Sequence, residues 1–312
     1  SEMARRAPGK SPLATARSEK DAVEIVSGVF EGRSCGTPLC GIIRNTDTRS
    51  RDYASTRWLA RPGHADFTAH LRYGGFEDYR GGGHFSGRMT APLVFAGAIA
   101  KTALRGSGIT VYARISQVAG IADAPLDMAC PDLDALRAAS LKTFPVLDDA
   151  CGERMQNEIL AAREEQDSIG GTIECMITGL PAGLGDPMFD GIENRMAAAL
   201  FGIPAVKGVE FGAGFASAAM TGSENNDIYE TDGVNIVTKT NNCGGILGGM
   251  TDGMPLLFRA AVKPTPSIGM KQGSVSLTER KNVTLEIKGR HDPCIVPRAV
   301  PVCHRAEVRD DA

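Results

Sequence analysis

The run Gly245-Ile-Leu-Gly-Gly249-Met-Thr-Asp-Gly253-Met-Pro255-Leu256 repeats the pattern of Gly28-Val-Phe-Glu-Gly32-Arg-Ser-Cys-Gly36-Thr-Pro38-Leu39. Both runs fit G-φ-φ-x-G-x-[ST]-x-G-x-P-L, where φ is an apolar residue. Glycines and a proline on one grid, with apolar residues between them, predict the same strand-turn-strand unit used twice, about a pseudo-twofold axis. Chance similarity between two glycine-rich turns is the alternative.

The two copies lie 217 positions apart, so elements that precede the second copy should also precede the first. Three such elements are Asp167-Ser-Ile-Gly-Gly171, the loop that ends at Gly185, and a helix near Ile192. Subtracting 217 places their partners before residue 1. We therefore expect that a strand, a loop and part of a helix are missing from the start of this sequence, where Ser1-Glu-Met-Ala-Arg5-Arg6 reads like the end of a helix.

The rest of the chain alternates between strand-like and helix-like patterns. The patterns predict strands at 23–29, 39–43, 108–118, 171–177, 206–211, 234–240 and 256–262, and helices at 91–104, 132–143, 147–165 and 192–200. Hairpin-like strand pairs with helices between them favour an α+β fold, or α/β sandwich, over a doubly wound parallel sheet. No linker divides the chain, so we treat residues 1–312 as one domain.

Composition narrows the class of protein. The 312 residues include 34 basic and 37 acidic side chains, a net charge of −3, which lacks the basic excess of a nucleic-acid binder. No run approaches the roughly 18 apolar residues of a membrane helix, and no signal-peptide pattern opens the chain. We expect a soluble, cytoplasmic protein with no nucleic-acid or membrane partner.

The eight cysteines form no C-x-x-C pair and show no spacing typical of metal ligands. We therefore expect no metal site and no redox motif. Reduced, mostly buried thiols are the preferred interpretation. The cysteines are Cys35, Cys40, Cys130, Cys151, Cys175, Cys243, Cys294 and Cys303.

A glycine-rich and basic region is the clearest functional signal. It consists of Arg61-Pro-Gly-His64-Ala-Asp66 and Asp78-Tyr-Arg80-Gly-Gly-Gly83-His84-Phe-Ser86-Gly-Arg88. Glycine lets backbone N–H groups approach a ligand, and arginine and histidine add charge-assisted donors. The region therefore reads as an anion-binding loop that leads into a helix.

Other candidate groups have plain alternatives. His64 could donate a proton or bind an anion, or it could be a structural histidine, and His70 on a helical run is expected to be structural or exposed. Lys263-Pro-Thr265-Pro-Ser267 could cradle a phosphate or be an ordinary rigid turn. The Arg290-His291-Asp292 triplet before Pro293 places a carboxylate on a fixed loop, but such triplets also occur on solvated surfaces.

In order along the chain, RPGHAD, DYRGGG, PAVKGVEFG, NNxGGILGG, KPTPSIG and GRHDPC resemble the chorismate synthase family. The resemblance runs from about Arg5 to Val302. It implies helices sandwiched between two antiparallel sheets from duplicated halves, assembled as a homotetramer. The glycine run reads His84-Phe-Ser-Gly-Arg-Met-Thr90 where the commoner family version is R-S-S-A-R-E-T, so the contacts of His84 and Phe85 depart from the family pattern.

The resemblance implies a lyase that converts 5-enolpyruvylshikimate 3-phosphate to chorismate and phosphate, the last step of the shikimate route, with reduced FMN. NADPH or an external flavin reductase would keep the FMN reduced, and the missing dinucleotide fingerprint favours an external source. His64 and Asp292 match the family's proton-handling residues. Positions that match FMN contacts are His84, Phe85, Ser86, Pro204, Ala205, Gly248, Lys263, Pro264, Thr265, Pro266, Ser267 and Arg290. Arg6, Arg49, Arg88 and Arg298 are the candidate substrate ligands.

Two departures from the family remain. The family's opening G-E-S-H-G motif, with its second histidine, has no match here, and Asp167–Gly171 resembles a surviving twin of that motif. The polar residues after Val302 replace a mostly apolar helix. The alternatives to an active lyase are a catalytically impaired FMN-binding or structural fragment of the same fold and, less favoured, a phosphate-binding regulatory module.

Overall fold

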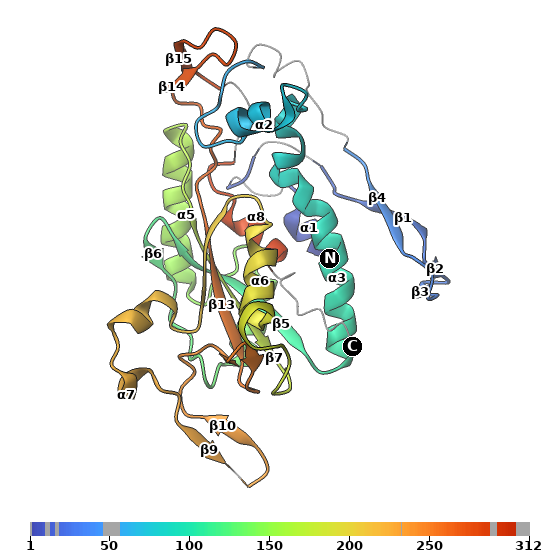
Figure 1. Ribbon diagram of the computed structural model, residues 1–312, viewed down its shortest axis with the longest axis vertical. Helices are drawn as coiled ribbons and strands as arrows, with labels where there is room; N and C mark the ends of the chain where they lie inside the picture. Colours follow the sequence, from blue (N-terminus) through green and yellow to red (C-terminus); the bar gives the residue numbers. More distant parts are fainter. Residues whose placement is uncertain are drawn as a thin grey trace.

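A five-stranded sheet forms the centre of the computed structural model, which describes residues 2–9, 13–15, 19–45, 57–231, 233–287 and 292–303. The strand order is β6-β5-β7-β13-β8, and every neighbouring pair is antiparallel (Figure 1). The strands are β5 (Thr110–Val118), β6 (Ile121–Ala122), β7 (Gly171–Thr178), β8 (Val206–Phe211) and β13 (Leu256–Val262). An antiparallel sheet covered by helices confirms the predicted α+β class.

Helices begin and end close to where the sequence predicts them. Asp132 and Asp148 accept hydrogen bonds from backbone N–H groups of the first turn and so cap α4 and α5. The helices are α1 (Glu2–Arg6), α2 (Asp66–Tyr73), α3 (Thr90–Gly106), α4 (Leu133–Leu141), α5 (Asp149–Glu164), α6 (Ile192–Phe201), α7 (Gly222–Asn225) and α8 (Val296–Cys303). The expected helix end at the start of the chain corresponds to α1.

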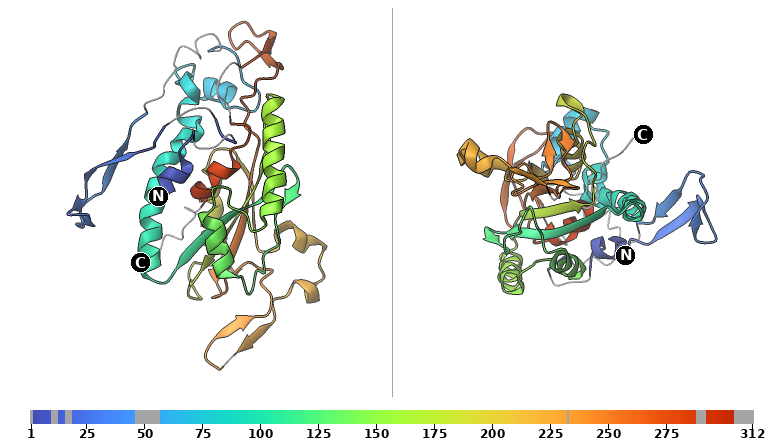
Figure 2. Two further views of the ribbon diagram at one scale, coloured as in Figure 1. Left: turned by 180° about the vertical axis from the view of Figure 1, so that it is seen from behind. Right: turned by 90° about the horizontal axis from the view of Figure 1, so that it is seen from below.

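Paired short strands extend from this body. They are β1 (Val23–Ser27) with β4 (Cys40–Ile43), β9 (Tyr229–Thr231) with β10 (Ile236–Thr238), and β14 (Gln272–Val275) with β15 (Asn282–Leu285). Helix α3 lies between the five-stranded sheet and the β1–β4 pair (Figures 1 and 2). Within the described ranges the sheet on the far side of α3 has these two antiparallel strands, so it is much smaller than the five-stranded sheet.

The repeat is confirmed at the level of individual hydrogen bonds. In the first copy β2 (Val29–Phe30) pairs with β3 (Arg33–Ser34), and in the second β11 (Ile246–Leu247) pairs with β12 (Met250–Thr251) in the same register. Cys35 N donates to Gly28 O at 3.2 Å, and Asp252 N donates to Gly245 O at 3.2 Å. Each of the glycines at the three shared positions has a positive φ, a conformation that glycine adopts without strain.

The environments of the two copies differ. A Cβ placed on Gly249 would approach the Asp186 carbonyl oxygen to 2.4 Å, whereas a Cβ on Gly32 would meet nothing within 4 Å. Phe30 of the first copy is 69% exposed and its equivalent Leu247 is 37% exposed, while Val29 is 38% exposed and its equivalent Ile246 only 2%. The second copy is therefore packed into the body, and the first extends from it.

The core lies on one face of the central sheet. Strand side chains alternate between faces, so Val111, Ala113 and Ile115 of β5 point to the same side. They pack with apolar residues of α3, α5, α6 and α8 in a single cluster. The opposite face carries a smaller cluster of Tyr112, Leu136, Met176 and Leu257. Burial of both faces fixes the register of the sheet.

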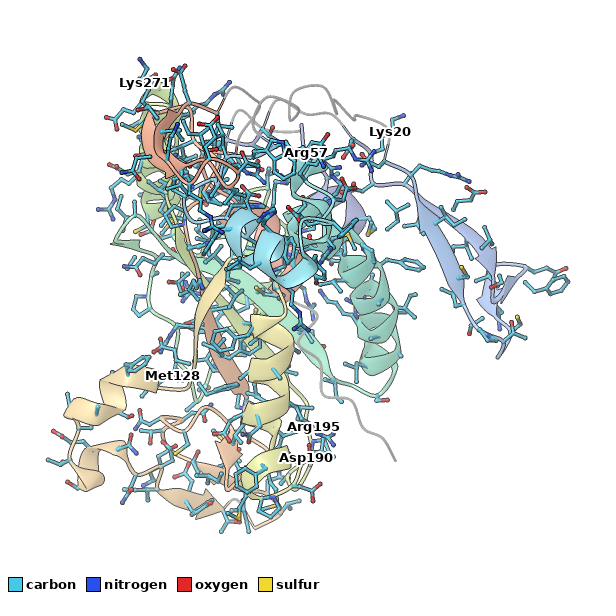
Figure 3. All side chains as sticks on the ribbon, turned by 45° about the horizontal axis from the view of Figure 1, so that its top comes forward. Lys20, Arg57, Met128, Asp190, Arg195 and Lys271 are labelled. Carbon is cyan, nitrogen blue, oxygen red and sulfur yellow. The ribbon has the colours of Figure 1, made fainter. Side chains whose placement is uncertain are left out.

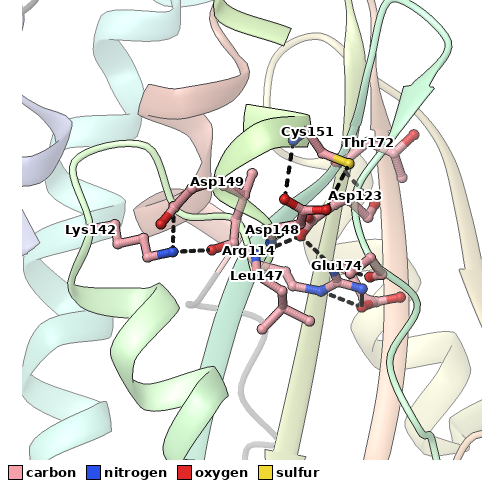
Figure 4. Close-up of polar contacts among 12 residues, drawn as sticks. Arg114, Asp123, Lys142, Leu147, Asp148, Asp149, Cys151, Thr172 and Glu174 are labelled. Carbon is pink, nitrogen blue, oxygen red and sulfur yellow. Dashed lines mark hydrogen bonds and ion pairs between the residues drawn. The ribbon is translucent and has the colours of Figure 1, made fainter. Parts of the chain in front are cut away.

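A buried ion network ties this second face to the α4–α5 connection (Figure 4). Arg114 donates to Asp123 at 2.5 Å and to Glu174 at 2.7 Å, and these side chains are almost fully buried. Asp123 also accepts hydrogen bonds from the backbone N–H groups of Leu147 and Asp148, at 2.7 and 2.9 Å. The carboxylate therefore holds the start of α5 against the sheet.

The burial of the cysteines and the apolarity of the helices bear on two of the expectations from the sequence. Cys175, Cys294 and Cys303 are buried, but Cys35, Cys40 and Cys130 are exposed, so the expectation of mostly buried thiols was wrong. All eight thiols are free, and burial raises the pKa of Cys303 to about 12. In the described part of the chain no helix has the length and apolarity to cross a membrane.

Candidate active site

Most of the predicted site residues gather where β13 ends. Val118, Gly171, Val262 and Val206 form one row across β5, β7, β13 and β8. The segment Lys263–Ser267 leaves the sheet from this row. Ala205 lies beside it, because Lys263 N donates a 2.9 Å hydrogen bond to Ala205 O. The antiparallel sheet therefore brings Pro204 and Ala205 next to Lys263 despite a separation of more than 50 positions.

The turn that carries His64 lies against the same segment. Lys263 Nζ donates to Gly63 O at 2.6 Å. A Cβ on Gly63 would lie 3.2 Å from Cβ of Pro266, and Gly63 has a φ of +69°. The close approach and the left-handed backbone both require glycine here. His64 and the Lys263–Ser267 segment thus belong to one site.

His64 is held by two charged residues of its own turn. Its Nδ1 lies 2.8 Å from Asp66 Oδ1. Arg61 donates to both oxygens of Asp66, each at 2.7 Å. Burial alone would raise the pKa of Asp66, but the hydrogen bonds from Arg61 and His64 hold that pKa well below its ordinary value. Asp66 is therefore a carboxylate that orients its two neighbours.

The glycine run packs against His64 and continues into α3. It forms two 3₁₀ turns, η2 (Arg80–Phe85) and η3 (Gly87–Met89), before α3 begins at Thr90. A Cβ on Gly82 would lie 3.0 Å from His64 Nε2. His84 is exposed, and its ring stacks on Phe85 with centroids 4.1 Å apart. Ser86 lies partly buried at the junction of the two turns.

Arg6 clamps the far end of the glycine run. Its guanidinium donates to Gly87 O at 3.1 Å, Arg88 O at 3.2 Å and Thr90 Oγ1 at 3.0 Å. It also forms an ion pair with Asp21, and Arg6 is only 3% exposed. These contacts turn the guanidinium toward the protein, so the geometry gives Arg6 a role in positioning the loop.

Asp292 lies in a neighbouring cluster with Arg298. Asp292 Oδ2 accepts a 2.7 Å hydrogen bond from Arg298, and Oδ1 accepts a 2.9 Å bond from Thr15 N. Arg298 also donates to Arg6 O at 3.0 Å. The predicted residues Arg6, Arg298 and Asp292 are thereby brought together from the two ends of the chain.

One loop links this cluster to the Lys263–Ser267 segment. Ser168 Oγ donates to Thr265 O at 2.7 Å, and Ile169 N donates to Pro293 O at 2.9 Å. The loop is the Asp167–Gly171 segment that the repeat singled out. Ser168 itself is 9% exposed. It therefore has a structural task, which is to fix the distance between Asp292 and the segment that follows β13.

Gly248 does not join this site. It sits in the β11–β12 turn, where Ile192 N donates to Gly249 O at the start of α6. That end is separated from Lys263 by the length of β13, about 20 Å at 3.3 Å per residue. Figure 3 labels residues at both ends. Arg57 lines a pocket with Arg61 and Asp66 at one end, and Asp190 and Arg195 flank the start of α6 at the other.

Two predicted ligands, Arg49 and Arg290, lie outside the described residues. Arg88 is partly buried at the start of α3. His70 is partly buried and pairs with Glu77 at 3.2 Å, in agreement with a structural role. Within the described ranges, His, Cys, Asp and Glu form no group of three or more that could hold a metal ion.

Sequence reasoning placed Arg61 and Asp66 in the anion-binding motif without giving either a role of its own, and it assigned no site role to Ser168 or Thr90. Arg61 and Asp66 flank His64 in the RPGHAD motif, so their charges and short spacing were a usable signal. Ser168 contacts the backbone of Thr265, 97 positions away, and Thr90 contacts Arg6, 84 positions away. No local sequence pattern predicts contacts between residues so far apart in the chain.

Known proteins with a similar sequence or fold belong to one family. The chorismate synthase family model matches residues 1–308. Chorismate synthase of Dehalococcoides mccartyi (strain BAV1) is 48% identical over 313 residues, covering 96% of this chain and 82% of that protein. Chorismate synthase of Methanocella arvoryzae is 48% identical, over 96% of this chain and 80% of that protein.

A solved structure titled "Crystal Structure of Chorismate Synthase" aligns with a TM-score of 0.74 and 27% identity, over 98% of this chain and 78% of that chain. Among the described residues, most of the motifs that carry the resemblance reach the site described above, and the NNxGGILGG motif that contains Gly248 is the exception. The sequence match, the shared fold and the family model lead to one conclusion: the chain belongs to the chorismate synthase family.

Proposed function

We propose that this chain converts 5-enolpyruvylshikimate 3-phosphate to chorismate and phosphate by 1,4-anti elimination, with reduced FMN as cofactor. One observation carries the proposal: the hydrogen bond from Lys263 to Gly63 places His64 against the Lys263–Ser267 segment. The loop at Ser168 and Ile169 ties that segment to Asp292. Proton-handling and anion-binding groups from both halves of the chain therefore converge at one end of the sheet.

The residues present fit a flavin phosphate or ring edge. Thr265 Oγ1 is buried and has no hydrogen-bond partner among the residues that the structure describes. An unpaired buried hydroxyl costs about 1–3 kcal/mol, and a ligand acceptor would remove that cost. Gly82 and Gly83, both with a positive φ, form the facing loop, and Gly83 is partly exposed there. When bound, reduced FMN supplies an electron-rich ring that assists loss of phosphate and is restored as the C6 hydrogen leaves.

The FMN ligands that we propose within one chain are the following described residues: His84, Phe85, Ser86, Pro204, Ala205, Lys263, Pro264, Thr265, Pro266 and Ser267. Pro204 has no N–H group and can contribute only its carbonyl or ring. Gly248 is at the opposite end of β13. In the homotetramer that we propose, Gly248 could reach FMN only from a neighbouring subunit.

Arginines would bind the anionic groups of the substrate. Arg88 at the start of α3 and Arg298 beside Asp292 are the described candidates, because guanidinium forks pair well with phosphate and carboxylate. Arg6 would act one step removed, by holding the Gly87–Thr90 backbone. Its burial lowers its pKa, against the opposing effect of Asp21, and a buried cation still contributes to an anion-attracting field.

His64 and Asp292 would handle protons. His64 would keep the flavin ring in its required protonation state, and Asp292 would accept or relay the proton from C6. Both side chains are partly buried and hydrogen-bonded, so their orientations are fixed before substrate binds. NADPH or an external flavin reductase would supply the reducing equivalents, and we place the enzyme in the cytoplasm.

The direct test is chorismate formation from 5-enolpyruvylshikimate 3-phosphate by the full 312-residue chain with chemically reduced FMN under anaerobic conditions. We expect turnover that requires reduced FMN. FMN binding without turnover would support the impaired fragment instead. Binding of simple phosphate esters without FMN binding would support a regulatory phosphate module.

A further inference from the structure

We propose that Asp66 is a positioning residue that fixes His64 as the Nδ1–H tautomer and turns Nε2 toward the glycine run. The catalytic consequence rests on the function proposed above, but the tautomer itself does not. Asp66 is the third charged residue of the RPGHAD turn, and its only polar side-chain partners in the described structure are Arg61 and His64.

The hydrogen bond from His64 to Asp66 is the shortest that the imidazole makes. Nδ1 lies 2.8 Å from Oδ1 of Asp66. A carboxylate can only accept a hydrogen bond, so Nδ1 must carry the proton in this contact. The two side chains are 14% and 19% exposed, and partial burial strengthens a charge-assisted bond relative to water.

Arg61 gives a competing contact that geometry resolves. Its Nη2 lies 3.1 Å from Nδ1 and 3.5 Å from Nε2 of His64. A donor on the in-plane lone-pair axis of Nδ1 would lie about 5 Å from Nε2, because the two ring nitrogens point apart. Nearly equal distances instead place the guanidinium nitrogen over the ring. Arg61 therefore covers the imidazole face and leaves the in-plane contact of Nδ1 to Asp66.

The other ring nitrogen faces the glycine run. A Cβ on Gly82 would lie 3.0 Å from Nε2 and 3.7 Å from Cβ of Ser86. Gly82 has a φ of +85° and is buried, and a side chain at this position would crowd the imidazole. With Nδ1 bonded to Asp66, Nε2 is the nitrogen left to accept or donate a proton on the side of the glycine run.

Asp66 also fixes Arg61, so one carboxylate sets two groups. Arg61 donates to Asp66 through Nε, Nη2 and its backbone N–H, at 2.7, 2.7 and 3.0 Å. The guanidinium is 10% exposed. Removing Asp66 would leave a buried cation over an imidazole whose Nδ1 has lost its acceptor. The expected result is a changed tautomer as well as a displaced ring.

The test is a ¹⁵N spectrum of imidazole side chains in the full chain labelled with ¹⁵N-histidine, without FMN. His64→Gln assigns the His64 signals by their loss. We expect neutral His64 to show a protonated Nδ1 and an unprotonated Nε2. In Asp66→Ala, the Nε2–H form, which free imidazole side chains prefer, should replace it. Glu77→Gln is the matched control, since it alters the neighbouring pair of His70 and Glu77 and should leave the His64 signals unchanged.

A wild-type spectrum with the proton on Nε2 overturns the proposal, and this outcome needs no variant to fold. An unchanged His64 tautomer in Asp66→Ala also overturns it. Asp66→Asn serves if the alanine variant does not fold, and we expect it to show a mixture of tautomers because the amide offers one acceptor. With substrate and reduced FMN, Asp66→Ala should lower kcat about 10- to 100-fold while FMN remains bound. Absence of turnover in the wild type would refute the proposed function and leave the spectrum to decide the tautomer.

Discussion

Lys263 donates a 2.6 Å hydrogen bond to the backbone carbonyl of Gly63, a residue 200 positions earlier in the chain. The bond joins the end of β13 to the turn that carries His64. A flexible ammonium group that reaches a carbonyl serves here as a bridge between two halves of the site. Lys263 also lies within the segment that we assign to FMN, so its loss should affect both FMN binding and the position of the turn that carries His64.

Replacing Lys263 by Met keeps the length of the side chain but removes the bridge and its charge. We expect FMN affinity to fall by about tenfold or more, the size expected for losing one hydrogen bond to a charged group. Titration of FMN by fluorescence measures the change. Lys271→Met, at an exposed lysine just before β14, should bind FMN like the wild type, and equal weakening by both variants would contradict a specific role.

Replacing Asp292 by Asn removes a proton acceptor while keeping the shape of the side chain. We expect turnover to fall about 100-fold or more, with FMN affinity nearly unchanged, because the lost function is proton transfer. Steady-state kinetics with a parallel FMN titration separate the two effects. Asp190→Asn, which breaks an exposed ion pair with Arg195, is the control, and an active Asp292→Asn variant would remove Asp292 from its assigned role.

Replacing His64 by Ala should cost less than replacing Asp292, since solvent can protonate a ligand at a partly open site. The dependence of kcat on pH should nevertheless change shape, because one titrating group has been removed. The pH–rate profile of the variant is the decisive measurement. A profile that overlays that of the wild type would argue against a proton-handling role for His64.

Replacing Asp123 by Asn should destabilise the protein strongly. The change leaves Arg114 buried with a weakened partner, and breaking a buried pair costs about 3–5 kcal/mol. Urea unfolding followed by circular dichroism measures the loss. Asp149→Asn lies in the same region (Figure 4), but Asp149 is exposed and its partner Lys142 is only partly buried, so we expect a change of about 1 kcal/mol or less. Similar losses for both variants would refute the distinction.

The lowered pKa of Asp66 predicts that the free energy of unfolding depends on pH in the acid range. Its pKa is lower in the folded protein than the ordinary value of about 4, so the folded state favours the carboxylate. The contribution is therefore complete above about pH 4 and is lost as the pH falls toward the folded pKa. The stability difference between wild type and Asp66→Asn should stay constant from about pH 6 to about pH 5 and shrink as the pH falls from about 4 toward about 3. A difference that grows on acidification would contradict the assignment.

The sequence predicted the fold best at positions where glycine alone adopts the backbone conformation without strain. Gly28 and Gly245 have φ values of +88° and +82°, and their spacing to the following proline revealed the duplicated hairpin. Helix α5 was equally accessible, because Asp148 caps it and Met155 and Ile159 repeat on its buried face. Strand β10 was predicted too long, at 234–240 instead of Ile236–Thr238, since an exposed hairpin gives no burial pattern to mark its ends.

The site could be predicted as a set of motifs but not as a geometry. The sequence offers no clue that Arg6 is buried, because its partners Asp21, Gly87 and Thr90 are remote in the chain. Gly248 shows a second limit, since its motif matches a flavin contact while its position within one chain is at the other end of β13 from Lys263. The distances between motifs depend on the register with which the strands pair. A single sequence does not reveal that register.

The duplicated hairpin has a practical consequence for anyone who would alter this protein. Three left-handed glycines and one closing hydrogen bond are shared by both copies, whereas only the second copy has the Asp186 and Gly191 backbone packed against its turn. Side chains of the outer copy, such as Phe30, can thus be exchanged for recognition or labelling groups without redrawing the main chain. The inner copy offers the same scaffold but no such freedom, because Asp186 and Gly191 press directly on its turn.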